Sequence, residues 1–213
     1  MPLESYHITV PASAKGEDRV DILRLDSGVV MVVADGVGGR PGGGEAATLL
    51  VENAVNYFVT ADYDIDDLAL TRLLTEMDQA LADDENAGET TAVVAVVTDD
   101  GITGAYVGDS DAYLILPTSE YKLTHGRRKP YLGYGAAYPE PFNAELRDGT
   151  LLLASDGLWK YADLDKICTI VRSPDLSLEE IARQLVDAAR IPNGSLLDDI
   201  AIALCRRVAP LVA

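Results

Sequence analysis

Cysteine is scarce in this chain of 213 residues, which contains only two cysteines and two histidines. No C-x-x-C pair occurs, so a disulfide framework is not indicated. Cys168 and Cys205 each lie within an apolar run, and unpaired cysteine is among the most buried residue types. We therefore expect two buried free thiols and a reducing compartment.

Long apolar runs are also missing. No run approaches the roughly 18 residues that a membrane-spanning helix needs. The beginning of the chain lacks the basic and then apolar pattern of a signal peptide. These absences predict a cytoplasmic protein that does not associate with a membrane.

Basic residues are few compared with acidic ones. The chain has 17 Lys and Arg against 35 Asp and Glu, which gives a formal net charge of −18. Such a surface repels nucleic-acid phosphates and anionic membranes, so neither is an expected partner. The length and the 48% hydrophobic content suit one globular domain spanning residues 1–213.

The acidic residues that stand out lie where strand-like runs begin or end. Asp35, Asp109 and Asp156 each follow an apolar run, whereas Glu17–Asp18 and Asp198–Asp199 each precede one. In an antiparallel sheet the end of one strand lies beside the start of its neighbour, so these acids can converge on one rim. Crowded carboxylates repel one another and have raised pKa values unless cations neutralise them. The pattern therefore predicts a metal site.

The order of the expected elements indicates the fold class. Strands come in runs, with two long helices between the third and fourth strands and one before the last, which favours an α+β fold of antiparallel sheets covered by helices. Glycine-rich Gly36–Gly44 and Tyr131–Asn143 are expected to be irregular. The helices are expected at Glu45–Val59, from about Ile65 to Leu81, and from a capping box at Ser177 to about Ala189. The strands are expected at Tyr6–Val10, Val20–Leu25, Val29–Asp35, Thr91–Thr98, Ile102–Val107, Ala112–Leu116, Tyr121–Leu123, Thr150–Ser155 and Ile200–Arg206.

The ligand chemistry favours hard cations. Every candidate ligand is an oxygen, with no histidine or cysteine nearby, which suits Mg²⁺ or Mn²⁺ better than zinc. In Asp35-Gly36, the strand end fixes the carboxylate, and glycine lets the next carbonyl turn toward the same ion. The alternative is a tight turn in which Asp35 hydrogen-bonds the backbone. Two ions about 4 Å apart would suit in-line phosphoryl displacement by an activated water.

These motifs, taken in order, resemble a known family. The chain looks like a metal-dependent protein serine/threonine phosphatase of the protein phosphatase 2C type, in a compact bacterial form. The resemblance implies a four-layer α-β-β-α sandwich of two antiparallel sheets flanked by helices, with a binuclear metal centre at one rim. The matching segments are Glu17-Asp18, Ala34–Gly39, Gly88–Ala92, Val107–Ser110, Ser155–Leu158 and Gly194–Ile200.

The resemblance also implies roles for individual residues. Asp35 would bridge two ions and the Gly36 carbonyl would bind one of them, while Asp156 and Asp198 would ligate the other. Glu17 and Asp18 would hold metal-bound waters. Asp109 would help Asp156 to form a third, weaker site, although a strand-end turn would also explain it. Asp199 would act indirectly by supporting the ligands.

Three departures from the family pattern affect the substrate side. Ser13 stands where the family usually carries a phosphate-binding arginine, so a weaker hold on phosphate is expected. Lys15, Arg40 or the cluster Arg127-Arg128-Lys129 are candidate replacements, although the cluster also suits an ordinary exposed loop. Val37 replaces the histidine that donates a proton in many eukaryotic members. The interval between Asp109 and Asp156 is short, which suggests a trimmed flap and a more open site.

Two functions follow as expectations. The first is hydrolysis of phosphoserine or phosphothreonine on a phosphoprotein, itself a substrate of a serine/threonine kinase, by a monomeric enzyme with two Mn²⁺ or Mg²⁺ ions. The second is a catalytically weak binding or regulatory module that keeps the fold. Retention of every carboxylate position favours the enzyme, because unpaired buried acids are costly.

Overall fold

The structure is a computed structural model that describes residues 2–39, 41–60, 66–126 and 129–208. Its helices are α1 (Gly43–Thr60), α2 (Asp67–Ala82), α3 (Asp156–Trp159), α4 (Leu164–Val171) and α5 (Leu178–Ala188). Its strands are β1 (Leu3–Val10), β2 (Asp18–Leu25), β3 (Gly28–Asp35), β4 (Ala92–Thr98), β5 (Ile102–Val107), β6 (Asp111–Ile115), β7 (Glu120–Lys122), β8 (Glu140–Ala144), β9 (Thr150–Ala154) and β10 (Ile200–Arg207).

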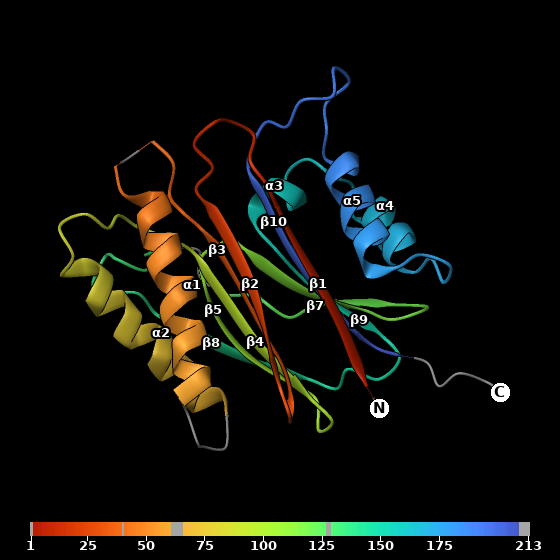
Figure 1. Cartoon of the computed structure of the whole chain (residues 1–213), viewed down its shortest axis with the longest axis horizontal. Coiled ribbons are helices and arrows are strands. Elements are labelled where there is room, and N and C mark those ends of the chain that lie inside the picture. Colours follow the sequence, from red (N-terminus) through yellow and green to blue (C-terminus); the bar gives the residue numbers. More distant parts are fainter. Residues whose placement is uncertain (1, 40, 61–65, 127–128, 209–213) are drawn as a thin grey trace.

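The strands form two five-stranded antiparallel sheets. One sheet has the order β1-β10-β9-β6-β7, and the other has the order β2-β3-β4-β5-β8. Helices α1 and α2 cover the outer face of the second sheet, and α4 and α5 cover the outer face of the first (Figure 1). This arrangement confirms the predicted α+β fold with four α-β-β-α layers.

The apolar residues of β3 contribute to two separate hydrophobic cores. Val30, Val32 and Ala34 pack toward the helices, whereas Val29, Met31 and Val33 pack between the two sheets. Alternate residues of a strand point to opposite faces, so a strand covered on both sides must be apolar throughout. Burial on both faces fixes the register of β3, and that register fixes where Asp35 emerges at the rim.

Most of the expected elements are confirmed, with two corrections. Helix α1 begins at Gly43, inside the stretch Gly36–Gly44 that we expected to be a loop, because Gly43 packs closely on the backbone of that loop. Strand β8 occupies the end of the segment Tyr131–Asn143 that we expected to be irregular. Strand β8 is an edge strand, where a proline such as Pro141 is tolerated.

Two helices were not predicted. Helix α3 has only four residues, too few to show a helical period, and α4 has eight. The expected helix beginning at Ile65 starts at Asp67 in the described chain, with Asp66 as its cap, and Ile65 itself lies outside the described residues.

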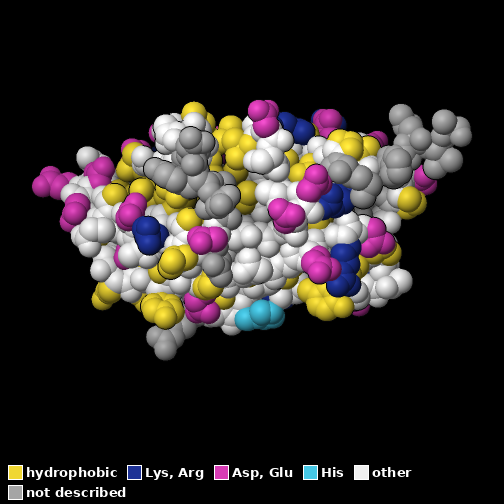
Figure 2. All heavy atoms as spheres, turned by 90° about the horizontal axis from the view of Figure 1, so that it is seen from below, with side chains coloured by type: hydrophobic (Ala, Val, Ile, Leu, Met, Phe, Trp, Pro, Cys, Tyr) yellow, Lys and Arg dark blue, Asp and Glu magenta, His cyan; other side chains and the backbone are white. Residues whose placement is uncertain are grey.

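The surface charge is spread out. Seen from below, acidic side chains are scattered over the whole face, with Lys and Arg among them (Figure 2). Both cysteines are free and buried, as expected. Among the described residues, no helix is both long and apolar enough to cross a membrane.

Candidate metal centre

Two carboxylates from neighbouring strands face each other at one rim of the molecule. Asp18 begins β2 and Asp35 ends β3, and the antiparallel register makes them direct partners. Asp18 is only 3% exposed, and its Oδ2 atom has no hydrogen-bond partner. A Cβ atom at Gly36 would lie 2.3 Å from the carbonyl oxygen of Gly43, so the close backbone approach requires glycine next to Asp35.

Two further carboxylates come from the other sheet. Asp156 begins α3 directly after β9, and Asp198 lies just before β10, which neighbours β9 in the sheet. The Oδ1 atom of Asp156 is buried without a hydrogen-bond partner. A Cβ atom at Gly157 would lie 2.0 Å from the carbonyl oxygen of Asp199, so the start of α3 packs directly on the segment that carries Asp198.

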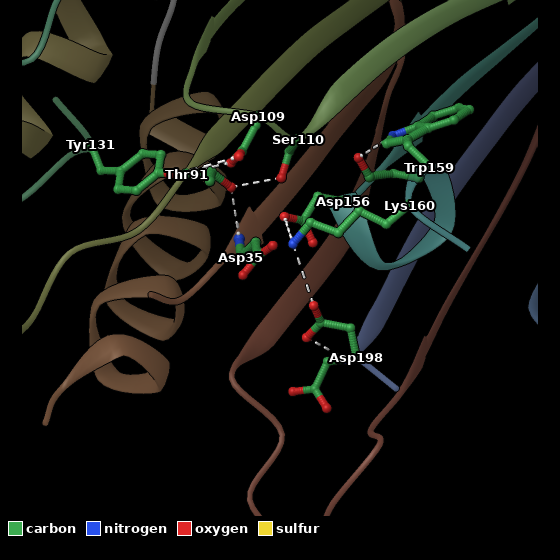
Figure 3. A network of polar contacts seen from close by, with 11 residues as sticks. Asp35, Thr91, Asp109, Ser110, Tyr131, Asp156, Trp159, Lys160 and Asp198 are labelled. Carbon is green, nitrogen blue, oxygen red and sulfur yellow. Dashed lines mark hydrogen bonds and ion pairs between the residues drawn. The ribbon is translucent and has the colours of Figure 1, made fainter. Parts of the chain in front are cut away.

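A hydrogen-bonded network links Asp35 to the segment carrying Asp109 (Figure 3). The Asp35 backbone N–H donates to Thr91 Oγ1 at 3.0 Å, and Thr91 Oγ1 lies 2.7 Å from Ser110 Oγ. The Tyr131 hydroxyl donates to Asp109 Oδ1 at 3.3 Å. Sequence reasoning missed Thr91, Ser110 and Tyr131 as supports, because the chain brings them here only through strand pairing and the loop before β8.

Asp199 holds the loop that carries Glu17. Its Oδ1 accepts from the Ala12 backbone N–H at 2.7 Å, and its Oδ2 accepts from the Glu17 backbone N–H at 2.6 Å. Ser13 lies on the same loop and is exposed. These contacts explain how Asp199 acts on Glu17 without having to point into the pocket as a ligand.

These residues line one pocket of about 220 Å³. The structure brings together every carboxylate predicted for the site. Lys15 is not among the lining residues, and the predicted substrate-binding Arg40, Arg127 and Arg128 lie outside the described residues. Lys129 is described, and its ammonium lies 5.2 Å from the ring centroid of Tyr131. The lining residues are Glu17, Asp18, Asp35, Gly36, Val37, Gly38, Thr91, Asp109, Tyr131, Asp156, Lys160, Asp198 and Asp199.

The crowding raises the pKa values of the central acids. Burial raises the pKa of Asp35 to about 9, and the charges of Asp18 and Asp156 add to the effect. Burial also raises the pKa of Asp18 to about 7, although a hydrogen bond with Ser155 opposes the rise. Without cations, the cluster therefore retains protons that isolated carboxyls would lose.

The donor set fits hard divalent cations. Every acidic lining residue offers oxygen, and two buried carboxylate oxygens, on Asp18 and Asp156, have no partner within the protein. Neither histidine nor cysteine is among the described residues that line the pocket. Within the described ranges, no three Asp, Glu, His or Cys side chains already converge closely enough to enclose an ion. The site is therefore an open, acid-lined rim rather than a closed cage.

Lys160 is the lining residue that sequence reasoning missed altogether. Its ammonium forms an ion pair with Asp156 and lies 3.5 Å from Asp198 Oδ2. Burial alone lowers the pKa of Lys160, but the hydrogen bond that its ammonium donates to Asp156 and the negative charges around it raise the pKa above its usual value. The sequence signal for Lys160 was its position four residues after Asp156, because this spacing places both side chains on one face of a helical turn.

The fold and the acidic rim match those of one protein family. The family model described as protein phosphatase 2C matches residues 10–134, and a second model of the same description matches residues 140–194. The chain belongs to the protein phosphatase 2C family. A comparison with curated proteins gives no match.

Solved structures share the fold across nearly the whole chain. The serine/threonine phosphatase Stp1 from Staphylococcus aureus is 21% identical, with a TM-score of 0.86 and coverage of 98% of this chain and 96% of that one. The catalytic domain of PstP, solved with two manganese ions, is 19% identical, with a TM-score of 0.82 and coverage of 97% and 99%. RsbX, solved with magnesium, is 18% identical, with a TM-score of 0.75 and coverage of 96% and 94%.

Proposed function

We propose that this protein hydrolyses phosphoserine and phosphothreonine on proteins at a binuclear Mn²⁺ or Mg²⁺ centre. The observation that carries the proposal is the convergence of Asp35, Asp156 and Asp198, from both sheets, on one pocket. Unpartnered buried oxygens in that pocket support it, because a buried carboxylate oxygen left unpaired is costly unless a ligand satisfies it.

The ligand roles follow from this arrangement. Asp35 and the Gly36 carbonyl would hold one ion, with Asp35 shared between the two. Asp156 and Asp198 would hold the other, and Asp109 would help Asp156 to form a third, weaker site. Glu17 and Asp18 would act through water. Bound ions would supply positive charge at the phosphoryl group and lower the pKa of the attacking water.

The protein residues around the ions position them and limit the chemistry. Thr91 and Asp199 fix the backbone at Asp35 and Glu17, so the carboxylates keep their places without an ion. Val37 lines the pocket at the position where many eukaryotic members carry a proton-donating histidine, and none of the described lining residues is a histidine. A water molecule, rather than an imidazole, would therefore protonate the leaving oxygen, or the enzyme would prefer an activated leaving group.

The substrate side is open. Asp198 and Lys160 have half-exposed side chains, at 45% and 49%, so the pocket meets solvent broadly. An exposed phosphorylated side chain on a protein surface suits such a site, and the phosphoprotein would be the product of a serine/threonine kinase. We propose that the enzyme acts as a monomer.

The test is a turnover assay with a matched control. Purified protein with Mn²⁺ or Mg²⁺ should hydrolyse p-nitrophenyl phosphate and phosphoserine peptides. Asp35→Ala and Asp156→Ala should abolish turnover, whereas Asp148→Ala, which changes an exposed turn acid, should not. Absence of turnover with every divalent ion would refute the enzyme, and ion binding without turnover would favour a binding module.

A further inference from the structure

Lys160 is the only positively charged residue among the described residues that line the pocket. It shares that pocket with seven carboxylates. Even two doubly charged ions would leave negative charge in excess if all the acids were ionised. A phosphate, itself an anion, therefore gains from every cation that can reach it.

The backbone of Lys160 is fixed, whereas its side chain is half exposed. The Lys160 backbone N–H donates to the Asp156 carbonyl at 2.8 Å and closes α3. The neighbouring Trp159 anchors this turn, because its Nε1–H donates to the Ala154 carbonyl at 3.0 Å and its ring packs 4.7 Å from that of Tyr113. The Lys160 side chain is nevertheless 49% exposed on a flexible four-carbon stem.

The ammonium of Lys160 lies against the carboxylates that the proposed function gives to one ion. It pairs with Asp156 and reaches Asp198 at 3.5 Å, and Figure 3 shows it between the two side chains. An ammonium and a divalent ion cannot both neutralise the same carboxylate oxygens at close range. A divalent ion that binds Asp156 Oδ2 or Asp198 Oδ2 would therefore displace the lysine, which remains tethered at the edge of the pocket.

We propose that Lys160 exchanges partners, pairing with Asp156 and Asp198 in the ion-free protein and binding the substrate phosphate once divalent ions hold those carboxylates. The proposal rests on the proposed phosphatase function. Lysine is a suitable phosphate ligand, because its ammonium is a compact charge with three donors. In the ion-free protein Lys160 therefore competes with one divalent ion for the carboxylates. In the enzyme with its ions bound, Lys160 binds the substrate phosphate.

The ion half of the proposal is tested by calorimetric titration with Mn²⁺. Lys160→Met removes the competitor, so we expect it to bind Mn²⁺ more tightly at one site, by about two- to fivefold, the scale of a partly exposed ion pair. Lys166→Met, on the exposed face of α4, is the control and should bind Mn²⁺ like the unchanged protein. Unchanged affinity in Lys160→Met would overturn the exchange.

The phosphate half is tested with p-nitrophenyl phosphate at saturating Mn²⁺. Lys160→Met should raise KM by at least about tenfold, the scale of one lost charge-assisted hydrogen bond, with a smaller change in kcat. Lys160→Arg should have a KM close to that of the unchanged protein, because arginine keeps the positive charge. A KM that stays the same would overturn phosphate binding by Lys160.

The metal centre and the role of Lys160 can be refuted separately. If neither the unchanged protein nor Lys160→Met binds Mn²⁺, the metal centre itself is refuted, and the exchange is refuted with it. The unchanged protein and Lys160→Met could instead bind Mn²⁺ with the same affinity and hydrolyse the substrate with the same KM. That result would support the phosphatase function and refute only the role of Lys160.

Discussion

Asp18 and Asp35 face each other across β2 and β3 as the last pair of the antiparallel ladder. Both lie in a pocket wall, and burial raises the pKa of each, to about 7 for Asp18 and about 9 for Asp35. Like charges directly opposite each other destabilise a sheet. The pair is therefore a cost to the ion-free fold, which the proposed cations would relieve.

The stability of the ion-free protein should fall as pH rises. Asp18 and Asp35 have folded-state pKa values above the ordinary value of 3.8, so the folded state binds more protons than the unfolded state from about pH 4 upward. Their stabilising protonation is fully present below that pH and is lost as pH rises through about 7 and about 9. In EDTA, Tm should fall between pH 5 and pH 9 by an amount on the order of 5 °C.

Saturating Mn²⁺ should reverse that trend, because ions bind the deprotonated carboxylates and stabilise the folded state. Thermal unfolding in EDTA and in saturating Mn²⁺, measured at pH 5, 7 and 9, checks this prediction. An ion-free Tm that rises with pH across the same range would contradict the assignment of raised pKa values.

Asp35→Asn should stabilise the ion-free protein while removing activity. The amide has nearly the same shape and needs no proton, so the cost of burying a carboxyl whose folded-state pKa is raised to about 9 disappears. We expect a Tm in EDTA at pH 8 that is higher by a few degrees and a loss of turnover of at least about a thousandfold. Asp26→Asn, in the turn at the other end of β2, is the control. A lower Tm would show that Asp35 supports the fold through contacts of its own.

Asp199→Ala should weaken ion binding indirectly. The substitution frees the backbone N–H groups of Ala12 and Glu17, so the loop that presents Glu17 loses its tether. Residues that orient ligands are commonly worth about 10- to 100-fold in metal affinity, and we expect a loss at the lower end of that range. Asp199→Asn keeps one accepting oxygen, so its affinity for Mn²⁺ should lie between those of the unchanged protein and Asp199→Ala. Equal Mn²⁺ affinity in all three would rule out this positioning role.

Asp78 ties the loop before β8 to helix α2, and its removal should cost stability. It is 4% exposed, and its two oxygens accept from the backbone N–H groups of Gly133, Gly135 and Ala137 at 2.8–3.0 Å. Asp78→Ala leaves these donors without their partner and should lower the free energy of unfolding by roughly 3 kcal/mol. Urea unfolding measures this change.

The matched control for Asp78 is Glu76→Ala, an exposed acid on the same helix, which should change stability by less than about 0.5 kcal/mol. Asp78→Ala should also raise the Mn²⁺ concentration needed for turnover, because the same loop carries Tyr131, which donates to Asp109. A stability loss no larger than that of the control would show that other contacts hold this loop.

The residue pattern predicted antiparallel sheets covered by helices and an acidic rim, and the family resemblance added the four layers. Asp35 and Asp156 follow uninterrupted apolar runs, and Asp18 and Asp198 lie close to the start of such runs. Antiparallel pairing brings Asp18 beside Asp35 in one sheet, whereas Asp156 and Asp198 belong to the other sheet and meet that pair through the stacking of the two sheets. The apolar period of α1 and the capping box at Ser177, which the structure contains in full, were equally local signals.

What sequence reasoning missed depends either on very short elements or on contacts between distant segments. Lys160 enters the pocket because α3, a single turn too short for a period, places it one turn after Asp156. Asp78 looks like any polar residue of an amphipathic helix, and only the loop from residue 131 to 137 makes it buried. Pro141 argued against a strand, yet the edge position of β8 tolerates it.

The central claim is that folding gathers Asp35, Asp156 and Asp198 into a pocket that holds paired divalent cations. The most direct measurement is anomalous diffraction from crystals of the protein grown with Mn²⁺. The account predicts two strong manganese peaks in this pocket, one beside Asp35 and Gly36 and one beside Asp156 and Asp198, with the Lys160 ammonium moved away from Asp156. A fully loaded crystal with no manganese peak in contact with these carboxylates would contradict it.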